Sequence, residues 1–122
     1  MSEKESKVIV TDQHFEEFKD GFNHYVERFG LKDYKIYFEQ VDSDEFYGSI
    51  DADPRNGIAT IKLCKEIDAR DINDFVPYET GKHEAIHLLL ARIEWIGSCR
   101  YVESGEISTE IERLVRILEK NL

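Results

Sequence analysis

The sequence predicts a single α+β domain over residues 1–122, in which a helix, a small sheet of about three strands and two further helices follow one another. Three observations predict this order. Apolar residues recur at helical spacing up to Gly30, partly alternate between Tyr34 and Leu63, and return to helical spacing from Pro77. A chain of 122 residues suits one domain, and its 41% of hydrophobic residues is enough to build one core.

The first helix is predicted from a cap and an aromatic stripe. We expect residues 1–10 to form a partly frayed tail that leads into Val8-Ile9-Val10, after which Thr11 or Asp12 offers an N-cap. Gly30 supplies the end of the helix. Six residues share the buried face of this helix, and core packing explains them without a cofactor: Phe15, Phe18, Phe22, Tyr25, Val26 and Phe29.

The residue pattern in the middle of the chain predicts a small sheet that contains antiparallel strands. Residues 34–39 partly alternate, residues 46–50 are rich in aromatic side chains, and residues 58–63 are rich in β-branched ones. Between the last two segments, residues 53–57 (Asp-Pro-Arg-Asn-Gly) are dense in turn formers. This turn predicts a β-hairpin.

Two helices complete the prediction. Pro77 suits a first helical turn, and the helix runs to Gly97. After a loop over residues 98–105, Thr109 and Glu112 have the spacing of a capping box for a last helix. The apolar stripe of that helix, which we expect to be buried, consists of Ile107, Ile111, Leu114, Val115 and Leu118.

Charge and hydropathy exclude two classes of partner. The formal net charge is −10, so the phosphates of nucleic acids or of an anionic membrane would be repelled. No apolar run approaches the roughly 20 residues of a membrane span. Residues 1–7 are charged and lack the apolar core of a signal peptide. We therefore expect a cytoplasmic protein that binds neither nucleic acid nor membranes.

The chemistry is carried by His83-Glu84-Ala85-Ile86-His87. Four residues are just over one helical turn, so His83 and His87 share one face, about 6 Å apart along the axis. Both imidazoles can therefore bind one Zn²⁺. Glu84 lies one residue round from that face, where it can hydrogen-bond a water held by the metal. Zinc lowers the pKa of such a water to about 7, and the carboxylate can take its proton as attack begins.

With this motif, residues 80–89 (Thr-Gly-Lys-His-Glu-Ala-Ile-His-Leu-Leu) resemble the zincin metallopeptidases. The order of a hairpin, the motif helix and a second helix is similar to the minimal single-domain zincins of phages and prokaryotes. The resemblance implies zinc, Glu84 as general base and hydrolysis of peptide bonds in a peptide or protein substrate. It also implies a strand beside the helix, for which Ile58–Leu63 is the candidate, and an oxyanion donor, for which Tyr101 is a candidate.

A third zinc ligand has to come from elsewhere in the chain. Metzincins place a glycine and a histidine where this chain has Leu90 and Ile93, and no histidine follows His87. A carboxylate is therefore expected, in a plan that resembles the gluzincins, with its glutamate on the following helix. The candidates are Glu103, Glu106, Glu110 and Glu112, with Glu94 as an outsider two turns beyond His87.

Among these, Glu110 is the predicted ligand. It falls at the edge of the apolar stripe of the last helix, where a carboxylate is costly to desolvate unless something pairs with it. Glu106 lies further round, and the capping box would explain Glu112. Glu103 has a suitable angle only if the helix begins before Ser104-Gly105.

Two other functions stay open at this point. The chain can be a catalytically silent binding or regulatory module of zincin fold, although such a module has no chemical need for Glu84. It can also be a hydrolase of a bond other than the peptide bond. The sequence names neither the substrate nor the oligomeric state.

Overall fold

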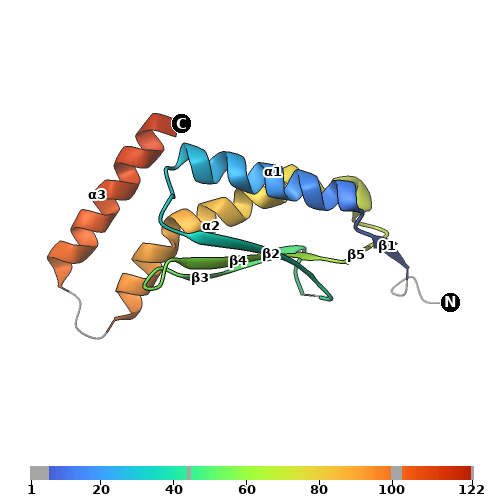
Figure 1. Ribbon diagram of the computed structural model, residues 1–122, viewed down its shortest axis with the longest axis horizontal. Coiled ribbons are helices and arrows are strands. Elements are labelled where there is room, and N and C mark those ends of the chain that lie inside the picture. Colours follow the sequence, from blue (N-terminus) through green and yellow to red (C-terminus); the bar gives the residue numbers. More distant parts are fainter. Residues whose placement is uncertain (1–5, 44, 100–102, 122) are drawn as a thin grey trace.

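A computed structural model describes residues 6–43, 45–99 and 103–121, and Figure 1 shows its course. An α+β fold is confirmed. In the described residues the elements follow in this order: β1 (Lys7–Ile9), α1 (Asp12–Arg28), β2 (Lys35–Val41), β3 (Gly48–Asp53), β4 (Ile58–Cys64), β5 (Glu66–Asp68), the short 3₁₀ helix η2 (Ile72–Asp74), α2 (Pro77–Ser98) and α3 (Ser104–Asn121). None of the described helices combines the length and the apolarity that a membrane span requires.

The main sheet has the strand order β2-β4-β3, so β4 is its centre. β3 and β4 pair antiparallel and form the predicted hairpin, while β2 runs parallel to β4. The turn holds Gly57 at a φ of 66°, and the Asn56 side chain donates a hydrogen bond to the Asp53 carboxylate at 2.7 Å. Asn56 and Gly57 therefore have the turn-forming roles that their residue types predict.

A second, two-stranded sheet pairs β1 with β5. Here the structure differs from the expected tail, because Lys7–Ile9 form a strand and Val10 is buried. The amide of Val10 also donates a hydrogen bond to the carbonyl of Lys65. Three residues next to a charged terminus carry too short a pattern to predict a strand, and pairing with the distant β5 decides their conformation.

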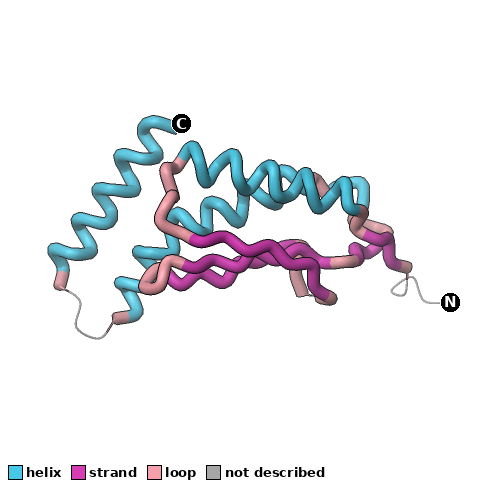
Figure 2. Tube along the Cα trace, in the orientation of Figure 1, coloured by secondary structure: helices cyan, strands magenta, loops and turns pink. Residues whose placement is uncertain are grey.

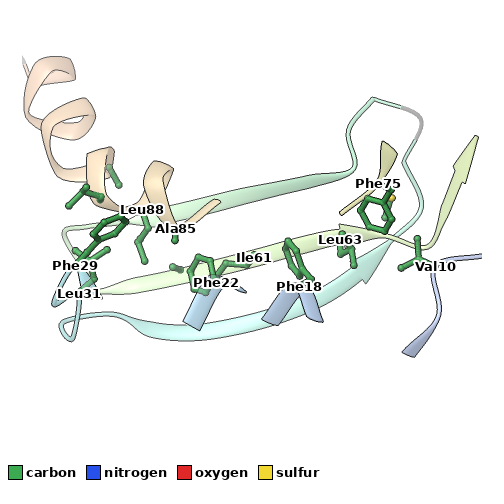
Figure 3. Packing of buried hydrophobic residues seen from close by; sticks show 14 of the residues in the cluster. Val10, Phe18, Phe22, Phe29, Leu31, Ile61, Leu63, Phe75, Ala85 and Leu88 are labelled. Atoms are coloured by element: carbon green, nitrogen blue, oxygen red, sulfur yellow. The ribbon is translucent and has the colours of Figure 1, made fainter. Parts of the chain in front are cut away.

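Helices α1 and α2 lie side by side on one face of the main sheet (Figures 1 and 2). Thr11 is the N-cap of α1, and Gly30 follows its end at a φ of 69°, as predicted. From β4, Ile61 and Leu63 point into the core and meet Phe18 and Phe22 of α1 (Figure 3). The aromatic stripe is therefore core.

Two glycines let α1 and α2 approach closely. A Cβ atom on Gly21 would overlap with the backbone carbonyl of Tyr78, and one on Gly81 would overlap with the backbone of Phe18 and Phe22. Both obstructing groups are backbone, which cannot move aside as a flexible side chain can. Gly81 lies two residues before His83, so this contact holds the first turns of α2, and with them the motif, against the core.

Helix α3 corrects two predictions. It begins at Ser104, so Thr109 is an interior residue whose hydroxyl donates to the carbonyl of Gly105, and the capping box is wrong. The buried face is also rotated from the predicted stripe. Leu114 is buried as predicted, but Ile111 is 49% exposed and Val115 is 40% exposed. Leu118 packs against the core as predicted, and Ile117, which lies outside the predicted stripe, does so as well.

Candidate metal centre

The motif histidines lie on one face of α2, one turn apart. Pro77 occupies the first turn of the helix, and the Val76 carbonyl accepts the amide hydrogen of Thr80 at 3.0 Å, so the helix is regular well before the motif. The ring centroids of His83 and His87 are 4.8 Å apart, with the ring planes at 75°. Both side chains are exposed. Two imidazole nitrogens are thus available on one solvent-facing surface, as the spacing predicts.

Glu84 has a different environment from its neighbours. Its residue is only 3% exposed, and one of its carboxylate oxygens lies 3.4 Å from the position that a Cβ atom would take at Gly48 of β3. That is ordinary contact distance, whereas the same Cβ atom would come within 2.9 Å of the Thr80 methyl group, so glycine at this position lets β3 approach the Thr80 side chain of α2. Burial raises the pKa of Glu84, and charge on His83 and His87 acts against that rise. A buried carboxylate next to two histidines is an environment that can tune a base.

A cleft between α2 and β3 contains these side chains. One cavity of about 400 Å³ is lined by His83 and Glu84 together with Tyr47 and Gly48. A second, of about 450 Å³, is lined by His87 and by Ile50 and Ala52 of β3. The two cavities lie on either side of the histidine pair along α2. An extended chain that followed the cleft would pass both histidines.

The strand that borders the cleft is β3, and this corrects the predicted role of Ile58–Leu63. That segment lies in β4, the central strand, whose two edges are taken by β2 and β3. β3 pairs only with β4 in the described structure. Its outer edge can therefore offer backbone groups to a further strand. The sequence pattern does not distinguish an edge strand from a central strand here, because β3 and β4 are both partly apolar.

Tyr47 is a site residue that the sequence reasoning missed. It lies just before β3 and lines the same cavity as His83 and Glu84. Partial burial and a hydrogen bond with Asp71 raise its pKa to about 12, so the phenol keeps its proton at neutral pH. In the sequence, Tyr47 is marked by its place next to Gly48. The sequence does not show that this segment lies beside α2, because that contact arises only when the strands pair. Tyr101, the earlier candidate, lies outside the described residues.

Glu110 is buried, as predicted, but the structure does not bring it to the histidines. Its residue is 6% exposed, and Arg113 donates to its carboxylate from Nε at 2.8 Å. Arg113 lines one cavity together with Tyr34 and with Arg92 of α2. Arg92 comes nine residues after His83, which places it about 180° from His83 round the helix axis. Glu110 therefore lies beside the face of α2 opposite to the motif.

The remaining candidates for the third ligand are all exposed: Glu94, Glu103, Glu106 and Glu112. Of these, Glu94 lines the cavity beside His87. Within residues 6–43, 45–99 and 103–121, no three His, Cys, Asp or Glu side chains come close enough together to hold a metal ion.

The arrangement fits part of a zinc site. His83 and His87 supply two nitrogen donors at the spacing that zinc accepts, and Glu84 adjoins them. The structure does not place a third protein donor beside them. No protein-family model, curated protein or solved structure matches the chain.

Proposed function

We propose that the protein is a zinc-dependent metallopeptidase that hydrolyses a peptide or protein substrate bound in the cleft between α2 and β3. The observation that carries this proposal is the pairing of His83 and His87 at 4.8 Å between ring centroids, with the buried Glu84 carboxylate next to them. Two imidazoles and an adjacent base are the groups that metal-assisted hydrolysis needs on one helix.

Each side chain has a distinct role in this proposal. His83 and His87 would hold Zn²⁺, which when bound lowers the pKa of a water and polarises the substrate carbonyl. Glu84 would accept the proton of that water and deliver it to the leaving amine. Tyr47 lines the same cavity, and on substrate binding its hydroxyl would turn from Asp71 to donate its single hydrogen bond to the substrate carbonyl oxygen.

β3 would orient the substrate. An extended peptide can add as a further strand to a free sheet edge, and its backbone then follows the cleft past both histidines. Strand pairing uses backbone groups, so it accepts many sequences. The cavities on either side of the histidines would then supply the contacts to substrate side chains.

Glu110 stays the proposed third ligand on the ground of sequence alone. It is the buried carboxylate among the described glutamates of α3. Pairing with Arg113 explains this burial as well, without a metal. The two roles make different predictions for the zinc affinity of the Glu110→Ala and Arg113→Ala variants.

A catalytically silent binding module is the alternative function. The environment of Glu84 argues against it, because a buried carboxylate costs stability and nothing in the described packing repays that cost. A module that only binds would be more stable with a neutral side chain at this position.

Metal analysis of the purified protein tests the proposal. We expect one zinc ion per chain in the wild type, and loss of stoichiometric zinc in both His83→Ala and His87→Ala. His24→Ala is the matched control, since His24 is an exposed histidine of α1 and lines neither cavity of the cleft. Zinc content that is the same in His87→Ala and His24→Ala would show that the motif does not bind the metal.

A further inference from the structure

The cleft has one sign of charge along its length. Each cavity beside the histidine pair carries carboxylates, and no lysine or arginine of the described chain lines either of them. The carboxylates in addition to Glu84 are Asp51 and Glu94 in the cavity beside His87, and Asp74 and Glu79 in the cavity beside His83. A cleft lined by one sign of charge concentrates ligands of the opposite sign.

The cavity beside His87 combines this charge with apolar walls. Ile50, Ala52 and Ala91 line it, and Trp95 adds an aromatic ring that is 40% exposed. Asp51 is already paired with Lys62, whose Nζ lies 2.7 Å from its carboxylate. Glu94 forms no ion pair with any described residue, which leaves it as the free carboxylate of this cavity.

The adjoining cavity and the net charge of the chain add to the negative charge of the cleft. The Glu84 carboxylate accepts no hydrogen bond from any described residue, although its residue is 97% buried and lines the adjoining cavity. The whole chain carries a formal net charge of −10. Basic segments would therefore be attracted to the protein and then concentrated in the cleft, while acidic segments would be repelled from it.

We propose that the cavity beside His87 binds a lysine or arginine side chain of an extended peptide, and that Glu94 determines this preference. The methylene stem of such a side chain would lie on Ile50 and Trp95, and its charged head would reach Glu94. The Trp95 ring would add a cation–π contact. This inference deepens the proposed function and rests on it for the alignment of the peptide along β3.

The test measures peptide binding to the full-length Glu84→Gln variant, which separates binding from turnover. The probes are three fluorescein-labelled, alanine-rich dodecapeptides that carry two lysines, two glutamines or two glutamates at the same positions. We expect the lysine peptide to bind about tenfold more tightly than the glutamate peptide, by fluorescence anisotropy. Equal affinity for the three peptides would overturn the inference.

Glu94→Gln in the same background identifies the residue responsible. It should weaken binding of the lysine peptide about three- to fivefold, the range of a partly exposed ion pair, while zinc content stays the same. Glu119→Gln removes the same charge from an exposed position on α3, outside the cavities of the cleft, and should change affinity less than twofold. If both variants lost the same affinity for the lysine peptide, the preference would come from the net charge of the protein. That result would overturn the role of Glu94.

Digestion of unfolded proteins by the wild type separates this inference from the proposed function. Cut sites mapped by mass spectrometry should be enriched in lysine or arginine next to the cleaved bond. Cleavage without that enrichment overturns the inference and leaves the peptidase. No cleavage, together with a preference for the lysine peptide that depends on Glu94, overturns the peptidase and supports the pocket.

Discussion

Glu84 is buried between α2 and β3 while its neighbours His83 and His87 face solvent, and this contrast within five residues is the chemical basis of the proposed site. Helical geometry explains it. His83 and His87 differ by about 40° round the helix axis, whereas Glu84 is about 100° from His83, on the side that faces the sheet. One motif therefore presents two imidazoles outward and one carboxylate inward.

Replacing Glu84 by glutamine tests its role as the base. Glutamine keeps the shape of the side chain but cannot accept the proton, so any hydrolytic activity should fall about 100- to 10,000-fold. Zinc content should not change, because Glu84 is not a proposed ligand. Activity can be followed by fragment formation from an unfolded protein, and zinc by metal analysis. A glutamine variant that cleaves at the wild-type rate would remove Glu84 from the mechanism.

The two cysteines should differ in reactivity with a thiol reagent. Cys64 is fully buried in β4, and burial raises the pKa of its thiol, so the reactive thiolate is both rare and inaccessible. Cys99 is partly exposed. In the folded protein we expect one thiol to react quickly, with the second reacting only on addition of denaturant. Peptide mapping should place the early label on Cys99, and early label on Cys64 would contradict its place in the core.

The close approach of α1 and α2 depends on Gly81. In Gly81→Ala the added methyl group would overlap with backbone atoms of Phe18 and Phe22. We therefore expect this variant to lower the free energy of unfolding by about 3 kcal/mol or more. Because the same contact holds the first turns of α2, zinc affinity should fall as well. Denaturant unfolding followed by circular dichroism measures the first effect.

Gly97→Ala is the matched control for this change. Gly97 lies in the same helix, and a Cβ atom there would meet nothing within 4 Å. Alanine favours the helix, so stability should rise by about 0–1 kcal/mol. Equal destabilisation of both variants would mean that helix geometry, and not the approach of α1, decides the effect.

The position of α3 in the fold decides whether Glu110 can be a ligand. If zinc is bound by Glu110, then Glu110→Ala should lose zinc affinity while Arg113→Ala keeps it, and this is the result that the proposed third ligand predicts. The structure pairs the two residues, so both variants should also lose about 1–2 kcal/mol of stability. Titration with a competing chelator measures zinc affinity. Equal, wild-type zinc affinity in both variants would restrict Glu110 to the ion pair with Arg113.

The local features of this protein are determined by its sequence. Thr11 and Gly30 bound α1, Asn56 and Gly57 form the hairpin turn, and His83 and His87 face the same way. Each of these depends on residues a few positions apart, because caps, tight turns and neighbours at i and i+4 are set by backbone geometry within one element.

Features that join distant elements were decided only by the tertiary structure. The strand that borders the cleft is β3 and not β4, because three strands with similar apolar content can be ordered in several ways until they pair. Tyr47 reaches the site through that pairing. Helix α3 buries Glu110 against Arg113 and leaves Ile111 and Val115 exposed, although helical periodicity predicts all five stripe residues to be buried. Periodicity defines a stripe on a helix, but the rotation and position of the helix come from packing against α2, and these determine which carboxylate can approach His83 and His87.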